Sequence, residues 1–316
     1  MAAIHPGQWG IIVNLTAGGG AVKKQWPAIE AALKAGLPVG QVWFTEYPKH
    51  AIELVDVAIK AGCRRLIAVG GDGTNHEVAN GILMQQIVAP PEITYALLPV
   101  GTGNDWARTY QIPRGLKSWV EMVQEGKTRF QDAGKVEYRD KNEQNRTRYF
   151  VNVAGMAYDA FVVQYAESRR SPGAGRFYYL LMILWCLFRY RHVKSAVKHG
   201  NSRSEDYFYT INIGICRYSG GGIQMTPHAL PDDGLLALTL AGRISKLGVL
   251  LATRRFYNGT ISKHPKVSLF QTAALEVEAV GVMPVLLEAD GEFLGQAPAK
   301  FSVVEKALCI VVPSVR

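Results

Sequence analysis

Short apolar runs alternate with segments of helical spacing along the first 130 residues. Four of the runs are typical of buried strands: WGIIVNL, VGQVWF, RRLIAV and ITYALLP. Between the first three runs, apolar residues recur every three or four positions, from Val22 to Leu33 and again from Ile52 to Ile59. Gly36 and Gly62 follow these two helical stretches and are expected to end them. The alternation predicts an α/β domain with a parallel sheet that is covered by helices on both faces.

The pattern changes near residue 130, and β-rich runs then follow one another mostly without helices between them. These runs are RYFVNVAG, YFYTINIGI, LLALTLAG, AALEVEA and VLLEADGEF. They predict an antiparallel β-sandwich. We therefore expect two domains, 1–130 and 131–316, with helical inserts in the second near 175–190 and 244–258.

The charge distribution and the cysteines indicate which partners and which cellular compartment suit the protein. The chain has 316 residues and a net charge of +9. Residues 132–203 hold 13 basic and 6 acidic side chains, so +7 of that surplus lies in one segment. Such a segment suits a polyanion, either nucleic acid or an anionic membrane, although solubility alone also explains basic charge. The four cysteines are scattered and the first residues lack a signal-peptide pattern, which predicts reduced thiols in a cytoplasmic protein.

Two glycine-rich turns share one design, each leading from an apolar strand into a helix. They are LIAVGGDGTNHEVANGI, which begins at Leu66, and ALLPVGTGNDWAR, which begins at Ala96. In both, a threonine is followed three residues later by an acid: Thr74 by Glu77, and Thr102 by Asp105. This spacing predicts capped helix N-termini, and capping alone would account for the turns.

A functional interpretation of the same turns is a phosphate site. Backbone N–H groups at a glycine-rich strand–helix turn attract anions, and ligands bind at the carboxyl ends of parallel strands. Asp72 lies between glycines and would repel phosphates unless a cation stood between them, which implies Mg²⁺. Neither turn matches the Walker A or the dinucleotide-binding pattern, so a different nucleotide fold is expected.

At this point the chain resembles the diacylglycerol kinase catalytic-domain family, which includes soluble bacterial lipid kinases and sphingosine kinases. GGDGT followed by GTGND carries the resemblance, and IIVNLTAGGG is similar to the first nucleotide-binding stretch of that family. PDDGLLAL and LEADGEFL resemble its two late Asp-Gly motifs. The match spans nearly the whole chain, with Leu15 in place of the usual proline.

The resemblance implies roles for individual residues. Asp290 is expected to accept the proton of the acceptor hydroxyl, although an isolated Asp-Gly is also a common hairpin turn. Asp72 and Asp105 are the metal-binding carboxylates expected near the phosphates. Asp233 and the backbone of Leu235 fit a second, structural Mg²⁺ site, but Leu230 stands where the family has another aspartate, with Asp232 as the nearest substitute. The residues expected to surround ATP are Asn14, Thr16, Gly18, Thr45, Gly71, Asp72, Gly73, Thr74 and Thr102.

An uncharged run of twelve residues, Phe177–Phe188, lies within the basic segment between flanking arginines. It is too short to cross a bilayer, which needs about 20 residues. A wholly buried core helix is one interpretation. We favour a helix that packs partly on the sandwich and partly contacts lipid, because basic flanks and aromatic residues suit a membrane surface.

Together these features predict an ATP-dependent lipid kinase. The γ-phosphate of MgATP would pass to a diacylglycerol-like or sphingoid hydroxyl at an interdomain cleft, in phospholipid biosynthesis. The protein would be cytoplasmic and peripherally bound to an anionic membrane, without nucleic acid, and a homodimer is compatible with the sequence. The alternatives are an NAD kinase, which shares GGDGT, and a non-catalytic lipid- or nucleotide-binding regulator.

Overall fold

The computed structural model describes residues 4–169 and 176–314, and for residues 176–180 it describes the backbone alone. The chain divides into two compact units. The first runs to Asp132 and also contains the residues from Glu305 onward. The second is Ala133–Val304. The sequence pattern by itself places every residue after 130 in the second domain.

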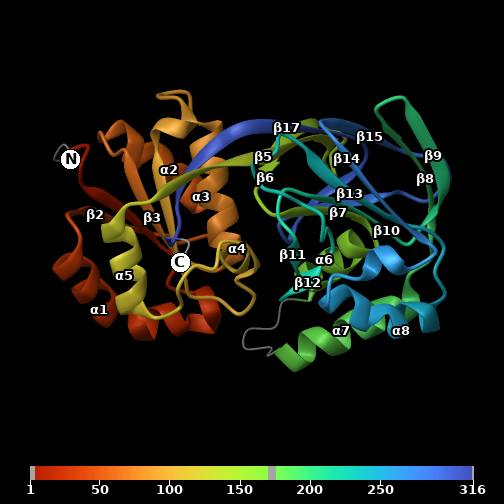
Figure 1. Ribbon diagram of the computed structural model, residues 1–316, viewed down its shortest axis with the longest axis horizontal. Helices are drawn as coiled ribbons and strands as arrows, with labels where there is room; N and C mark the ends of the chain where they lie inside the picture. Colours follow the sequence, from red (N-terminus) through yellow and green to blue (C-terminus); the bar gives the residue numbers. More distant parts are fainter. Residues whose placement is uncertain (1–3, 170–175, 315–316) are drawn as a thin grey trace. The chain divides into compact units, whose positions relative to one another are not determined.

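The first unit alternates strands and helices, as the periodicity predicts (Figure 1). Its sheet has the order β17-β4-β3-β1-β2, and every neighbouring pair is parallel. Helix α1 packs on α5 and α2 packs on α3. The elements are β1 (Trp9–Val13), α1 (Ala17–Gly36), β2 (Val39–Phe44), α2 (His50–Lys60), β3 (Arg65–Gly70), α3 (Asp72–Met84), η1 (Pro90–Glu92), β4 (Thr94–Pro99), α4 (Asp105–Thr109), α5 (Leu116–Glu125) and β5 (Thr128–Arg139).

The strand order of this sheet creates a switch point. From β1 the chain crosses to β2 on one side, and β3 and β4 then follow on the other side of β1. Because such crossovers are right-handed, the connections after β1 and β3 leave on opposite faces of the sheet. Ligands of open α/β sheets bind where neighbouring connections diverge in this way.

The second unit is a sandwich of antiparallel strands, which confirms the predicted fold class. One run of strands is β14-β13-β10-β7-β16-β17, and β17 also pairs with β15 and β5, which lead on to β8, β9 and β6. The elements are β6 (Asn145–Phe150), β7 (Val153–Ala157), α6 (Tyr158–Ser168), α7 (Arg176–Arg189), β8 (Val193–His199), β9 (Ser202–Phe208), β10 (Thr210–Gly214), β11 (Tyr218–Ser219), β12 (Ile223–Gln224), β13 (Leu236–Ala241), α8 (Lys246–Tyr257), η2 (Ile261–Lys263), β14 (Val267–Thr272), β15 (Ala274–Ala279), β16 (Leu286–Ala289) and β17 (Glu292–Val311).

The two predicted helical inserts are α7 and α8. Helix α7 packs on α6, where the hydroxyl of Tyr158 donates to the carbonyl of Ile183 at 2.7 Å. Within residues 4–169 and 176–314, no helix is both long and apolar enough to span a membrane. Of the arginines that flank the uncharged run, Arg170 lies outside the described residues, as do the side chains of Arg176 and Phe177.

Candidate active site

The turns after β1, β3 and β4 meet at one edge of the first unit's sheet. The N–H of Val100 donates to the carbonyl of Gly70 at 2.8 Å, and the N–H of Asn14 donates to that of Val69 at 3.1 Å. A Cβ on Gly101 would lie only 2.7 Å from the Cα of Gly71. The two glycine-rich turns therefore touch through their backbones, and any side chain at Gly101 would separate them.

Asn14 ties the first turn to the second. Its amide nitrogen donates to the hydroxyl of Thr74 at 3.1 Å. Its amide oxygen accepts from both the N–H of Thr16, at 3.0 Å, and the hydroxyl of Thr16, at 2.8 Å. Thr45 joins the same edge, because its N–H donates to the carbonyl of Val13 at 2.9 Å. Four of the residues predicted to surround ATP are thus brought to one edge of the sheet.

Three consecutive glycines, Gly18, Gly19 and Gly20, follow β1 with φ values of 62°, 66° and 86°. Residues with side chains rarely adopt such a left-handed run, so glycine is required by the backbone itself. A Cβ built on Gly19 or Gly20 would meet no atom within 4 Å. The turn therefore leaves open space over its backbone, as a phosphate-binding loop needs.

Gly73 shows the same open space without any backbone reason for a glycine. It lies in the first turn of α3, where its φ is not positive and a Cβ would meet nothing within 4 Å. The fold alone would accept alanine here, and helices favour alanine by about 1 kcal/mol. A ligand that approached the N-terminus of α3 would account for the missing side chain. This observation supports a phosphate at the predicted position.

The predicted helix caps are wrong at both turns. Helix α3 begins at Asp72 with Gly71 as its N-cap, so Thr74 is inside the helix and bonds Asn14 instead. Glu77 accepts hydrogen bonds from the N–H groups of Lys49 and Ala51, at 2.9 and 3.3 Å, and so caps α2 rather than its own helix.

The second turn departs from the capping box in its own way. Helix α4 begins at Asp105, and its N-cap is Asn104 in a left-handed conformation with φ of 52°. Thr102 lies exposed on the preceding loop. Neither threonine side chain therefore caps its helix: Thr74 bonds Asn14, and Thr102 is exposed to solvent.

Two carboxylates lie close together at these turns, Asp72 half-buried and Asp105 buried. Asp72 accepts a hydrogen bond from the N–H of Trp106 at 3.4 Å, at the start of α4. Burial and the neighbouring charge of Asp105 raise the pKa of Asp72 to about 6. Asp105 is itself 4% exposed, and its nearest cation is Arg108, with Nε 3.8 Å from Oδ1.

This carboxylate pair fits a magnesium ion. Mg²⁺ takes one or two carboxylates together with substrate phosphates, and keeps several waters. No cluster of three or more histidine, cysteine, aspartate or glutamate side chains with metal-ligand geometry exists among the described residues. A cation held by Asp72 and Asp105 would therefore need ligands from the nucleotide. The metal roles of both residues stay predictions.

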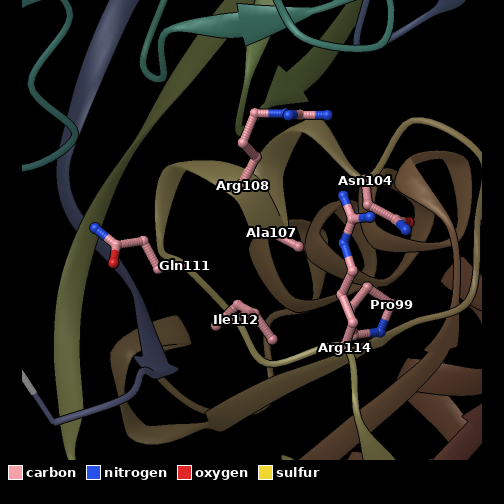
Figure 2. Close-up of a pocket in the computed structure, with 7 residues that line it drawn as sticks. All are labelled: Pro99, Asn104, Ala107, Arg108, Gln111, Ile112 and Arg114. Carbon is pink, nitrogen blue, oxygen red and sulfur yellow. The ribbon is translucent and has the colours of Figure 1, made fainter.

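A cavity of about 260 Å³ opens beside α4, lined by residues from Pro99 to Arg114 (Figure 2). Arg108 and Arg114 give its lining a positive charge, and Arg114 pairs with no carboxylate within the described part of the chain. Asn104 also lines it, and the buried Oδ1 atom of Asn104 accepts no hydrogen bond from the described residues. The sequence analysis did not predict that Arg114 and Asn104 line a cavity, although Asn104 is part of the GTGND motif.

Asp290 occupies a tight turn of the second unit, between β16 and β17. Asp290 and Gly291 have φ values of 50° and 83°, as in the two-residue turns that close β-hairpins. The carboxylate accepts three backbone N–H bonds, from Val151 at 2.9 Å, Asn152 at 3.0 Å and Val153 at 3.1 Å. These donors fix the position of the carboxylate. They lie about 140 residues away along the chain, so no sequence signal revealed them. The proton-accepting role stays a prediction.

The region of the expected structural metal site is held by hydrogen bonds. Asp233 Oδ1 accepts from the N–H of Leu235 at 3.1 Å, and Oδ2 accepts from the side chain of Gln271 at 3.0 Å. Leu230 is 47% exposed and offers no ligand atom in its side chain. Each oxygen of Asp233 accepts one hydrogen bond and keeps a further lone pair, so these contacts leave the metal roles predicted for Asp233 and the backbone of Leu235 untested. The metal role of Asp233 stays a prediction.

Comparison with known proteins agrees with the two-unit division. Residues 8–136 match the family "Diacylglycerol kinase catalytic domain", and residues 152–312 match "YegS C-terminal NAD kinase beta sandwich-like domain". A diacylglycerol kinase of Mycobacterium tuberculosis (strain CDC 1551 / Oshkosh) is 29% identical, covering 95% of this chain and 93% of its own. One from Staphylococcus aureus (strain bovine RF122 / ET3-1) is 27% identical, covering 96% and 92%.

Solved structures show the same fold at lower identity. A diacylglycerol kinase structure from Bacillus anthracis str. Sterne has a TM-score of 0.71 and 18% identity, covering 97% of each chain. Yeast NADH kinase in complex with NADH has a TM-score of 0.54 and 10% identity, covering 98% of this chain and 84% of its own. At these identities the likeness concerns the fold alone.

Proposed function

The chain belongs to the diacylglycerol kinase catalytic-domain family, and on that basis we propose that it is an ATP-dependent kinase of lipid hydroxyls. The acceptor would be diacylglycerol-like or sphingoid, and the reaction would serve phospholipid biosynthesis. The observation that carries the proposal is the unfilled space over Gly73, at the N-terminus of α3 and next to Asp72. A glycine that the fold does not need is best explained by a phosphate.

Each group of the site has a role in this proposal. Backbone N–H groups of the glycine turns would bind the phosphates of ATP, with Asn14 and Thr74 holding the turns together. Asp72 and Asp105 would hold Mg²⁺, which when bound would neutralise charge on the transferred phosphoryl group. Asp290 would orient the acceptor hydroxyl and take its proton as the oxygen–phosphorus bond forms. The leaving group is ADP.

The donor and acceptor are tested directly. The purified protein is incubated with MgATP labelled at the γ-phosphate and a panel of acceptors: diacylglycerol, sphingosine, other lipid alcohols and NAD. We expect label in one lipid class and none in NAD. Label in NAD alone would establish the NAD-kinase alternative, and label in no acceptor, with ATP still bound, would favour a non-catalytic regulator.

A further inference from the structure

Helices α7 and α8 of the second unit are in contact where α7 ends and α8 begins (Figure 1). Both helices expose apolar side chains. Among the α7 side chains that are described, the exposed apolar ones are Leu181, Trp185 and Phe188, which are spaced by four and three positions and so share one face. Trp185 is 50% and Phe188 is 58% exposed, whereas Cys186 and Leu187 between them are buried. The described part of α7 thus has a packed side and an open apolar side.

Helix α8 has the same two-sided character. Leu247, Leu250 and Leu251 are exposed at helical spacing, Leu247 to 66% and Leu251 to 75%. On its other side, Ala252 and Phe256 are buried against η2. Leucines exposed to this degree contribute little to the folded core, so the fold does not explain them.

A direct contact joins the two helices. The ammonium group of Lys246, in the first turn of α8, donates to the carbonyl of Phe188 in the last turn of α7. The same ammonium lies 5.9 Å from the centre of the Phe188 ring. Beside it, a ring nitrogen of His192 lies 3.0 Å from the carbonyl of Ile244. This contact brings the end of α7 close to the start of α8. We call the exposed apolar residues of the two helices the α7–α8 face: Leu181, Trp185, Phe188, Leu247, Leu250 and Leu251.

The chain segments that form α7 and α8 carry basic charge and no acidic charge. The chain has no aspartate or glutamate in residues 168–204 or 234–275, which contain both helices. Arg189, Lys246 and Arg254 are exposed, and in the described part of the chain none of the three pairs with a carboxylate. Arg189 lies 5.4 Å from the ring centre of Trp185, where its charge covers the aromatic face.

We propose that the α7–α8 face docks the protein on an anionic lipid surface, with α8 as an equal partner of α7. This inference deepens the proposed lipid-kinase function, on which it rests for the presence of a membrane-borne acceptor. Exposed leucines and a tryptophan would enter the headgroup boundary while the cations around them meet acidic headgroups. A second copy of the chain fits less well, since a symmetric contact would bring these cations against one another.

Vesicle sedimentation tests the proposal without ATP or acceptor lipid. The full chain is mixed with vesicles of phosphatidylcholine alone or with about 30% phosphatidylglycerol, an anionic lipid, at low and high salt. The test variant is Leu247→Ser with Leu251→Ser, on α8. The matched control is Val282→Ser, a fully exposed apolar residue elsewhere in the same unit. Circular dichroism melting verifies that each variant is folded.

We expect the wild type and Val282→Ser to bind the anionic vesicles in a salt-dependent way, and the α8 variant to bind at least about tenfold more weakly. The fluorescence of Trp185 should shift to the blue on binding, a change that Trp185→Phe removes. Equal binding of the α8 variant, or no preference for anionic vesicles, overturns the proposal, as does a loss of self-association without a loss of vesicle binding.

Activity on a short-chain, water-soluble acceptor separates the two failures. If the α8 variant phosphorylates it normally while vesicle binding is unaffected by the mutation, only the docking proposal is wrong. If vesicle binding behaves as expected and no acceptor is phosphorylated, the docking proposal stands and the lipid-kinase function fails.

Discussion

At the scale of single residues, Asp72 is a half-buried carboxylate beside the buried carboxylate of Asp105. Without a cation this arrangement is costly, which is why the pKa of Asp72 lies near 6. Asp72→Asn keeps the shape of the side chain and removes its charge. We expect turnover to fall by orders of magnitude while the melting temperature, measured above the pKa of Asp72, is unchanged or higher. Kinase assay and calorimetry measure the two effects.

The matched control is Asp56→Asn, an exposed aspartate on α2 that pairs with Lys60. It should leave both turnover and nucleotide affinity unchanged, because exposed ion pairs contribute at most about 1 kcal/mol. Near-normal turnover of Asp72→Asn would show that the carboxylate of Asp72 is not needed for catalysis, and that the two glycine turns have a structural role only.

Asp290 is predicted to act in transfer and not in nucleotide binding. Asp290→Asn should bind MgATP with near-normal affinity and lose about 10²-fold or more in kcat, the range for a positioned general base. It should also lower stability by roughly 1–3 kcal/mol, because the amide nitrogen replaces one carboxylate oxygen and cannot accept the backbone N–H bonds that this oxygen accepts.

Gly291→Ala separates chemistry from folding in that turn. It strains the same hairpin, since Gly291 has φ of 83°, but keeps the carboxylate of Asp290. If Gly291→Ala loses as much kcat as Asp290→Asn at equal loss of stability, the segment is only a turn. Asp105 is then the next carboxylate to test.

Asp159 gives a pH-dependent prediction. It is half-buried in the second unit and accepts a hydrogen bond from Thr210 at 2.6 Å, and the loss of hydration there raises its pKa from 3.8 to about 6. The folded protein therefore keeps this proton up to about pH 6, whereas the unfolded chain loses it near pH 4. The stability of the fold falls as the pH rises across that window, by at most about 3 kcal/mol, and the loss is complete above it.

Asp159→Asn removes this penalty while keeping an oxygen for Thr210 to donate to. Denaturant unfolding should show the variant more stable than the wild type at about pH 7.5 and no more stable near pH 4, on either side of the titration. A difference that stays constant with pH would contradict the assigned titration.

At the scale of elements, helix α3 contains two glycines that are present for opposite reasons. A Cβ on Gly81 would lie 2.7 Å from the Cβ of Val55 on α2, so Gly81 permits close helix packing, whereas Gly73 faces open space. Gly73→Ala should leave stability unchanged or raise it by up to about 1 kcal/mol, yet weaken ATP binding at least tenfold.

Gly81→Ala is the contrasting variant in the same helix. It should lower stability by about 1–3 kcal/mol through overpacking against α2. Calorimetric titration with ATP and thermal melting distinguish the two. Normal ATP affinity in Gly73→Ala would show that the open space over Gly73 does not accommodate ATP, and the proposed function would lose its main support.

The spacing of apolar residues predicted the helices and strands well, because buried strands show up as short apolar runs and amphipathic helices need apolar side chains every three or four positions. The strands β1 to β4 and the helix faces from Val22 to Leu33 follow the predicted pattern. The wrong predictions concern single hydrogen bonds. Thr74 and Glu77 have the spacing of a capping box, but Thr74 accepts a hydrogen bond from Asn14 instead. Glu77 accepts hydrogen bonds from backbone N–H groups at the N-terminus of α2. Contacts between distant segments, such as the N–H donors around Asp290, leave no local pattern.

At the scale of the whole molecule, the final strand belongs to both units. After its pairs with β16 and β15, β17 joins the first unit, where Cys309 and Ile310 pair in parallel with Thr94 and Tyr95 of β4. The N–H of Lys306 also donates to the buried Asp132 at 2.7 Å. The first unit is thus completed by residues that follow its other strands only after the whole of the second unit.

Leu308→Ala tests this dependence. Leu308 is fully buried, so the substitution should cost about 2–5 kcal/mol. Hydrogen exchange should report the loss in β3 and β4 of the first unit, and ATP affinity should fall in proportion to the fraction unfolded. Loss of protection confined to β7, β10 and β13 of the second unit would show that the strand end does not support the first sheet.

The return of this strand also has a consequence for how the protein is made. A ribosome releases β1 to β4 long before it has added residues 308–311. Until then, one side of β4 has no neighbour, and an apolar strand with free backbone groups is a template for pairing with other chains. The first unit therefore lacks its last strand segment until the entire second unit has been synthesised. The risk of aggregation is therefore greatest in that interval, and chaperone binding there should raise the yield of folded protein.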